Sequence, residues 1–128
     1  MTNTESNAYS MKEVKDLTGL SDHTLRYYEK DGILAEIRRQ KNGHRRYEKQ
    51  DLDWLDFVIC LRSTGMPLST IRKYRELMEQ GDSTAEERKD LLLEQKESLL
   101  EEITTLQDSL KRISFKIDYY DQLCSKNP

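Results

Sequence analysis

Residues 21–47 read SDHTLRYYEKDGILAEIRRQKNGHRRY, and this stretch decides the fold of the chain. Its pattern predicts a short helix from Asp22 to Lys30 and then a β-hairpin over Ile33–Tyr47, with a turn at Asn42-Gly43. Five lysines and arginines and no acidic residue lie in the span 38–46. A helix with polar side chains followed by a basic ribbon suits a DNA groove and the phosphates beside it.

The residues before this stretch predict another short helix. Ser10 and Glu13 have the spacing of a capping box, so we expect a helix from there to about Thr18. Gly19 is expected to end that helix in the left-handed conformation, and Ser21 to cap the next one. Two helices joined by a glycine-containing turn have the spacing of a helix-turn-helix.

Three further helices are expected after the hairpin. An apolar helix is predicted from about Gln50 to Ser63 and is ended by residues 64–67. Ser69 is expected to cap a helix over Thr70–Gln80. Residues 83–125 contain neither proline nor glycine, which predicts one long helix.

The long helix carries a heptad seam. Steps of four and three residues from Leu92 to Cys124 meet ten positions, of which eight are aliphatic or aromatic. These dimerisation candidates are Leu92, Leu99, Ile103, Leu106, Leu110, Ile113, Ile117 and Tyr120. Such a helix spans roughly 60 Å, which is too long to bury its stripe on a domain of about 80 residues. A second copy of the chain is the expected partner, and folding back onto its own domain is the alternative.

Composition and charge limit the class of protein. The 128 residues are 35% hydrophobic and 35% charged, enough for a small core but not for a large enclosed pocket. Residues 1–80 carry 14 Lys/Arg and 13 Asp/Glu, net +1, whereas residues 81–128 carry 7 and 11, net −4. DNA binding depends on where charge is placed more than on its total. No signal peptide or membrane span is recognisable, so we expect a cytoplasmic protein without a membrane partner.

The helix at 22–30 divides into two faces. Leu25 and Tyr28 are three residues apart and are expected to face the core. The opposite face is formed by His23, Arg26, Tyr27 and Lys30. Its side chains can all donate hydrogen bonds to phosphates or base edges, which favours a recognition helix over an ordinary solvated face.

The hairpin is expected to concentrate positive charge. A two-residue turn at Asn42-Gly43 would pair Lys41 with His44 and Arg39 with Arg46, and so place these four on one side. Like charges directly opposite one another destabilise a hairpin, unless a phosphate backbone neutralises them. The alternative is a charged edge that guards against aggregation.

The two cysteines, Cys60 and Cys124, are far apart in the sequence. Cys60 lies in an apolar helix, where it is either a small buried thiol or a redox or electrophile sensor. Cys124 falls on the heptad seam, either as a filler or as the site of an inter-chain disulfide. There is no CxxC or Cys/His cluster, so no metal site is predicted.

No pattern in the chain predicts catalysis. His23 and His44 have no evident serine, cysteine or carboxylate partner, and no phosphate-binding glycine loop occurs. The acids Asp51, Asp53 and Asp56 fit the first turns of a helix, where they favour its dipole. We therefore expect a protein without enzymatic activity and without a cofactor.

Several ordered motifs recur at a characteristic spacing. They are TLRYYE at 24–29, DGIL at 31–34, NGHRRY at 42–47, Asp51-Leu52, and LRSTGMPL at 61–68 followed by Ile71. Over residues 9 to about 80 the chain resembles the MerR family of bacterial transcription regulators. The long helix resembles the dimerisation coiled coil of that family.

The resemblance implies a mainly α fold. A disordered tail at 1–8 would precede a winged helix-turn-helix domain at 9–81, and residues 82–128 would form an antiparallel coiled coil. It further implies a homodimer on a pseudo-palindromic promoter site, between promoter elements set too far apart. Activating members distort and untwist such DNA so that RNA polymerase engages both elements.

The resemblance also implies roles for individual residues. Arg26 and Tyr27 match recognition-helix contacts, and Arg45, Arg46 and Tyr47 match wing contacts to the DNA backbone. His44 departs from the tyrosine often found at its position. The candidate DNA-binding residues together are Lys12, Ser21, His23, Thr24, Arg26, Tyr27, Arg39, Lys41, Asn42, His44, Arg45, Arg46 and Tyr47.

Cys60 matches a cysteine found in one branch of the family. That branch responds to aldehydes and other thiol-reactive stress, and its cysteine lies in the helix before the Leu-Arg-x-Thr-Gly-Met motif. We therefore expect a DNA-binding regulator that senses electrophiles through Cys60. The alternative is a coiled-coil interaction protein that binds another regulator or polymerase, which the seam fits equally well but the basic ribbon does not.

Overall fold

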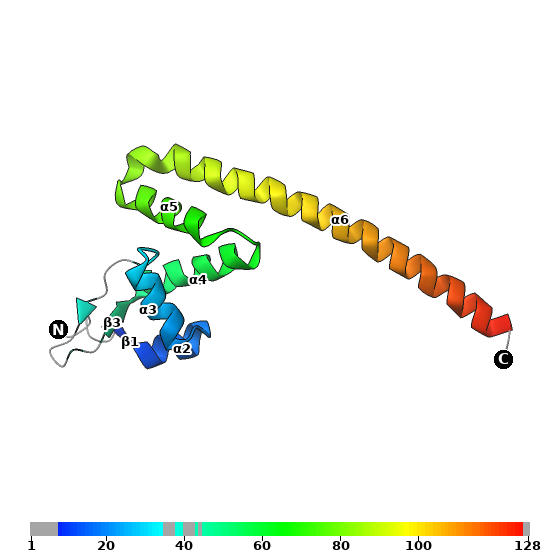
Figure 1. Ribbon diagram of the computed structural model, residues 1–128, viewed down its shortest axis with the longest axis horizontal. Helices are drawn as coiled ribbons and strands as arrows, with labels where there is room; N and C mark the ends of the chain where they lie inside the picture. The colour runs from blue at the N-terminus through cyan, green and yellow to red at the C-terminus, as the bar shows by residue number, and fades with distance from the viewer. Residues whose placement is uncertain (1–7, 35–37, 40–42, 44, 127–128) are drawn as a thin grey trace. The chain divides into compact units, whose positions relative to one another are not determined.

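The computed structural model describes residues 8–34, 38–39, 43 and 45–126 (Figure 1). The elements are β1 (Ala8–Ser10), α2 (Met11–Thr18), α3 (Asp22–Lys30), β2 (Arg38–Arg39), β3 (Arg45–Glu48), α4 (Lys49–Ser63), α5 (Leu68–Glu79), the 3₁₀ turn η1 (Asp82–Thr84) and α6 (Ala85–Lys126). The chain divides into two compact units, residues 1–89 and residues 90–128. The predicted mainly α class is confirmed, with a small sheet beside the first helices.

The helix-turn-helix forms as its capping residues predict. The Ser10 backbone N–H donates to Glu13 Oε1 at 3.0 Å, and the Glu13 N–H donates to Ser10 Oγ at 3.2 Å, which completes the capping box. Gly19 ends α2 at φ 77°, where its N–H donates to the Lys15 carbonyl at 2.8 Å. The Thr24 N–H donates to Ser21 Oγ at 3.1 Å, so α3 begins where the sequence places it.

The sheet has three antiparallel strands in the order β1-β3-β2. β1 was not predicted, because three residues are too few to show a strand period and their conformation comes from pairing with β3. Ala8, expected in the disordered tail, is instead paired with Glu48. The rest of that tail, residues 1–7, lies outside the described residues.

The register of the wing differs by one residue from the predicted one. Arg38 lies opposite Arg46 and Arg39 opposite Arg45, so the predicted pairing of Arg39 with Arg46 is wrong. Five residues separate the paired Arg39 and Arg45, an odd number that is incompatible with a two-residue turn. Gly43 has φ 86°, and a left-handed glycine suits a bulged three-residue hairpin loop as well as a type I′ turn. An Asn-Gly pair alone therefore does not fix the register.

A single core holds the first unit together. Its buried apolar residues are Val14, Leu25, Tyr28, Ile33, Leu34, Tyr47, Trp54, Leu55, Val58, Leu61, Met66, Ile71 and Leu77. Because α2, α3, β3, α4 and α5 all contribute to this set, the position of each helix is fixed by its apolar face. Ile33 and Leu34, expected in the hairpin, pack in the core from the turn after α3.

The LRSTGMPL motif at 61–68, between α4 and α5, ends α4. Arg62 Nη1 donates to the Met66 carbonyl at 2.9 Å, and Thr64 Oγ1 donates to the Leu61 carbonyl at 2.7 Å. Gly65 adopts φ 91° and Met66 is 1% exposed, so the chain turns back into the core. α5 then begins at Leu68 with Pro67 as N-cap, two residues before the predicted start. The fixed φ of proline suits a helix start, so Pro67 and not Ser69 is the N-cap of α5.

Trp54 joins α4 to the turn after α3. Its indole Nε1 donates to the Ile33 carbonyl at 2.7 Å in a buried position. Its ring stacks on Tyr74 of α5 at 5.9 Å, with 6° between the planes. The guanidinium of Arg75 lies over the same ring at 5.5 Å. One side chain of α4 therefore contacts both α5 and the turn after α3.

The start of α6 belongs to the first unit. Thr84 is buried, and its Oγ1 donates to the Leu77 carbonyl at 2.5 Å. Arg88 Nε donates to Thr84 Oγ1 at 3.1 Å. These bonds tie η1 and the first turn of α6 to α5, and the first compact unit extends to Lys89.

α6 is one uninterrupted helix (Figure 1). None of its residues is buried. It begins at Ala85 and ends at Lys126, close to the predicted span of 83–125. Among the described residues, no helix has both the length and the apolar character needed to cross a membrane.

Replacing Trp54 tests the central hydrogen bond. Trp54→Phe keeps an aromatic ring but leaves the buried Ile33 carbonyl without its donor, so we expect the free energy of unfolding to fall by about 1–3 kcal/mol. Urea denaturation followed by circular dichroism measures the change. Asp56→Asn, at an exposed position of the same helix, is the control. A loss below about 0.5 kcal/mol for Trp54→Phe would contradict this role.

Candidate nucleic-acid interface

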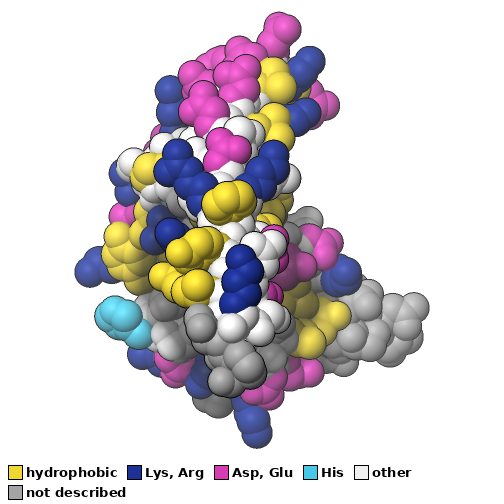
Figure 2. Space-filling model, turned by 90° about the vertical axis from the view of Figure 1, so that its right-hand side faces the viewer, with side chains coloured by type: hydrophobic (Ala, Val, Ile, Leu, Met, Phe, Trp, Pro, Cys, Tyr) yellow, Lys and Arg dark blue, Asp and Glu magenta, His cyan; other side chains and the backbone are white. Residues whose placement is uncertain are grey.

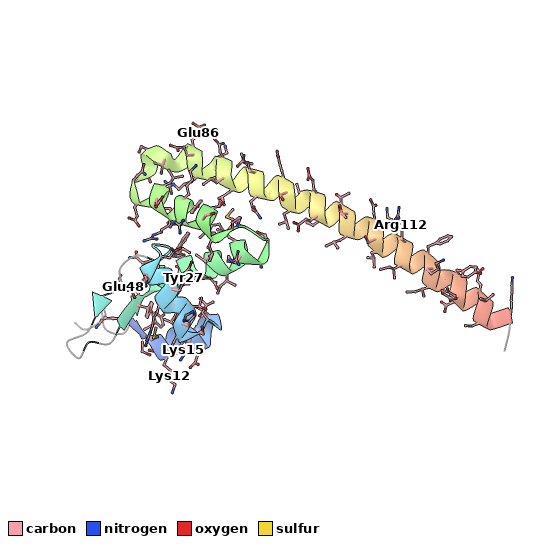
Figure 3. The ribbon with its side chains drawn as sticks, viewed as in Figure 1. Lys12, Lys15, Tyr27, Glu48, Glu86 and Arg112 are labelled. Atoms are coloured by element: carbon pink, nitrogen blue, oxygen red, sulfur yellow. The ribbon has the colours of Figure 1, made fainter. Side chains whose placement is uncertain are left out.

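α3 presents a polar face to solvent because its apolar face is buried. Leu25 is 0% exposed, whereas Tyr27 is 44% exposed and His23, Arg26 and Lys30 are also exposed. The two-faced helix predicted from the spacing is therefore confirmed. Figure 3 labels Tyr27 on α3, and Lys12 on the neighbouring α2. Lys12 is exposed on α2.

The first turn of α3 is tied to α2. Lys15 Nζ lies 2.6 Å from Asp22 Oδ1, and Arg26 Nη2 lies 3.8 Å from Asp22 Oδ2. The Arg26 side chain is 59% exposed, so its ion pair with Asp22 is a weak surface interaction. A phosphate or base edge can therefore replace Asp22 as the partner of the Arg26 guanidinium at a small cost in free energy.

Two of the predicted DNA-binding residues serve as the helix cap. Ser21 Oγ accepts from the Thr24 N–H and donates to Thr24 Oγ1 at 3.0 Å. Ser21 is exposed and Thr24 is half-buried. Both hydroxyls thus already take part in a local hydrogen bond that fixes the start of α3.

The wing brings basic residues together on neighbouring strands. The register places arginine opposite arginine in both described β2–β3 pairs. Arg46 is half-buried. Three further candidates, Lys41, Asn42 and His44, lie outside the described residues.

Tyr47 does not lie on this surface. It was predicted to contact the DNA backbone, but its side chain is 0% exposed. Side chains alternate between the two faces of a strand, so Tyr47 and Arg46 point to opposite faces. Tyr47 lies opposite Tyr9 of β1 and belongs to the core, so its side chain is not part of the exposed surface.

Cys60 is exposed on α4. Its neighbours Val58 and Leu61 form the buried side of the helix, so Cys60 lies on the other side. Its carbonyl accepts a hydrogen bond from Ser63 Oγ at 2.6 Å. The interpretation as a small buried thiol is therefore wrong, and the thiol is accessible to solutes. Cys124, on α6, is exposed as well.

The heptad seam of α6 is open to solvent over most of its length. Exposed seam residues are Ile103, Leu106, Leu110, Ile113, Ile117 and Tyr120, while Leu92 and Leu99 are half-buried. More exposed apolar residues flank the seam: Leu93, Leu100, Phe115, Tyr119 and Leu123. Hydrophobic side chains reach the surface among charged ones in Figure 2. A row of this length is typical of a protein–protein interface.

Sequence patterns did not predict the residues of neighbouring helices that fix the two ends of α3. Lys15 fixes its first turn, and Arg72 Nη1 lies 2.8 Å from Asp31 Oδ2 just after its last turn. No local pattern signals the second pair, because its partners are 41 residues apart. In the part of the chain that the structure describes, no group of three or more His, Cys, Asp or Glu side chains could hold a metal ion.

Two family models match the chain. One is described as a MerR HTH family regulatory protein and covers residues 9–77, and the other as MerR, DNA binding and covers residues 52–114. An uncharacterised HTH-type transcriptional regulator of Haemophilus influenzae is 34% identical over 89% of this chain and 84% of its own length. The HTH-type transcriptional regulator AdhR of Bacillus subtilis is 34% identical over 72% of this chain and 66% of its own length.

Solved structures agree with these sequence relatives. HiNmlR, a MerR family regulator lacking the sensor domain and bound to promoter DNA, is 34% identical with a TM-score of 0.80, covering 90% of this chain and 91% of its own. A MerR family protein from Listeria monocytogenes is 35% identical with a TM-score of 0.83, covering 88% and 86%. The match therefore extends over both units of the chain.

Proposed function

The chain belongs to the MerR family of helix-turn-helix transcriptional regulators, and we propose that it binds a pseudo-palindromic promoter site as a homodimer. The observation that carries the proposal is the exposed polar face of α3 beside a basic wing, on a fold that HiNmlR uses on promoter DNA. The family regulates transcription rather than catalysing a reaction. The exposed α3 face favours this function over that of a coiled-coil interaction protein.

The polar face of α3 and the wing contact different parts of the DNA. The residues of α3 enter the major groove, where phenol, imidazole and guanidinium groups donate to base edges and phosphates. The wing lies along the phosphate backbone. Its register places residues of like charge opposite one another, and a phosphate backbone would neutralise that charge.

A second copy of the chain covers the seam of α6. No residue of α6 is buried, and a helix of this length needs a partner for its apolar row. Residues 85–108 carry three cations and eight anions, net −5, whereas residues 109–126 carry four and two, net +2. An antiparallel pair places the acidic half of one helix beside the basic half of the other, while a parallel pair places like charges together.

The residues beside the seam support the same orientation. Antiparallel pairing about the middle of the seam brings Leu100 of one copy near Phe115 of the other. The same pairing brings Leu93 near Leu123 of the other copy. All four side chains are exposed in the single chain, so the pairing widens the apolar contact at both ends.

The dimer presents two copies of α3 to two half-sites. Bound between promoter elements that are set too far apart, it untwists the DNA so that RNA polymerase engages both. The regulator acts where the promoter lies, in the cytoplasm. This part of the proposal rests on the family resemblance.

Cys60 is the proposed sensor for thiol-reactive stress. Its sulfur adds to the carbonyl carbon of an aldehyde, and the carbonyl oxygen takes up the thiol proton, so a hemithioacetal forms without a leaving group. The exposure of Cys60 supports this role. An adduct on α4 alters the packing of the helix that also carries Trp54, and so biases the domain between two arrangements on DNA.

Removing wing arginines tests the phosphate contacts. Arg45→Ala and Arg46→Ala should each weaken operator binding and lower the slope of log affinity against log salt by about one. Fluorescence anisotropy with DNA from upstream of the gene, at several salt concentrations, measures both. Lys111→Ala, an exposed cation of α6, should leave the slope unchanged. Unchanged affinity for both arginine variants at every salt concentration would refute the wing assignment.

A thiol at position 92 tests the orientation of the dimer. About the middle of the seam, antiparallel pairing places Leu92 opposite Cys124 of the second copy, whereas parallel pairing places Cys124 opposite itself. In a Cys60→Ser background, copper phenanthroline should therefore cross-link the Leu92→Cys protein but not the Leu92 parent. Non-reducing electrophoresis gives the result. Cross-linking of the Leu92 parent as well would indicate a parallel pair, and a monomer in sedimentation would reject the dimer.

Substituting each cysteine tests the sensor. Cys60→Ser should bind the operator as the parent does but show no aldehyde-dependent change in its footprint, because serine is a far weaker nucleophile. Cys124→Ser should keep the aldehyde response. The assignment fails if Cys60→Ser still responds to the aldehyde normally.

A further inference from the structure

An ion pair joins α5 to the residue that follows α3. Arg72 Nη1 lies 2.8 Å from Asp31 Oδ2, and the two side chains are 39% and 24% exposed. The pair is therefore better shielded from water than Lys49 and Asp53, which are 67% and 68% exposed at 3.3 Å. Partial burial strengthens such a pair, because the effective dielectric constant is lower there.

The stem of Arg72 also lies beside the turn. Gly32 has φ 83°, and a Cβ built on it would be 4.0 Å from Arg72 Cδ. Arg72 thus approaches the turn with its alkyl chain as well as with its charge. Because Arg72 contacts the turn in both ways, a shift of α5 is transmitted to Asp31.

The turn is continuous with the last turn of α3. The Asp31 N–H donates to the Tyr27 carbonyl at 2.8 Å, and the Ile33 N–H donates to the Tyr28 carbonyl at 2.9 Å. Tyr27 belongs to the exposed face and Tyr28 to the buried one. The position of Asp31 therefore governs where the end of the exposed face lies.

We propose that Arg72 is a positioning residue for DNA recognition: by pairing with Asp31 it fixes the end of α3 and so sharpens the preference for the operator over other DNA. The proposal rests on the proposed function, because it presumes that α3 reads DNA. Arg72 acts through α3 and is not itself assigned a contact with a base or phosphate.

The two kinds of DNA contact differ in their need for accurate placement. Hydrogen bonds to base edges require donor–acceptor distances near 2.9 Å and good alignment. Attraction to phosphates falls off slowly with distance and carries no sequence information. A small shift of α3 therefore reduces specific binding and leaves non-specific binding nearly unchanged.

Asp31→Asn separates positioning from simple electrostatics. The substitution removes a negative charge, so electrostatics alone would strengthen DNA binding. The loss of the ion pair, in contrast, would weaken binding to the operator. The sign of the change therefore distinguishes the two effects.

The experiment measures two affinities for each full-length protein by fluorescence anisotropy. One probe is the operator located by footprinting upstream of the gene, and the other is a mixed-sequence duplex of equal length. We expect Asp31→Asn and Arg72→Ala each to weaken operator binding about fivefold to thirtyfold, with less than about a twofold change on mixed DNA. The salt slope on the operator should stay unchanged for Arg72→Ala, since no phosphate contact is lost.

Two controls complete the design. Asp53→Asn makes the same chemical change in the exposed Lys49–Asp53 pair and should not weaken binding to either DNA. The double variant Asp31→Asn/Arg72→Ala should be no weaker than either single variant, because both remove one interaction. Thermal unfolding verifies that each variant is folded. If Arg72→Ala does not fold, Arg72→Lys takes its place.

The outcomes are separable. Equal losses on operator and mixed DNA, a lower salt slope for Arg72→Ala, or operator binding by Asp31→Asn at or above that of the parent would overturn the positioning role. If the parent protein itself showed no preference for any upstream DNA, the proposed function would fail before the variants were compared.

Discussion

The hydrogen bond from the Trp54 indole to the Ile33 carbonyl is the constraint on which the first unit depends. It is buried, so leaving the carbonyl unsatisfied would cost far more than an exposed bond contributes. Tyr74 and Arg75 of α5 pack on the same ring. The turn after α3 is thereby fixed to α4 and α5, and the exposed face of α3 acquires a defined position relative to the rest of the domain.

Contacts outside the exposed face of α3 hold the helix, and this leaves the exposed face available to a ligand. Lys15 pairs with Asp22 at one end, and Arg72 pairs with Asp31 at the other. Leu25 and Tyr28 anchor the buried side. Rigid support of this kind is what base recognition requires, since the side chains that contact DNA must be placed accurately before they bind.

The features that sequence could predict are those with a local physical cause. The capping box at Ser10, the left-handed Gly19 and the two faces of α3 all follow from neighbouring residues. β1, the wing register and the burial of Tyr47 depend on pairing between distant strands, which no local pattern records. The Arg72–Asp31 pair is non-local for the same reason. The sequence thus predicted the α3 part of the candidate site but only some features of the wing.

The most direct test is a hydroxyl-radical footprint of the full-length protein on DNA from upstream of its gene. Two copies of α3, related by the two-fold axis of an α6 pair, should protect two backbone segments in a symmetric pattern about one helical turn apart, or a multiple of it. Such a footprint is the result we predict. A single unsymmetrical segment, or no protection at low salt, would contradict recognition by a dimeric α3 pair.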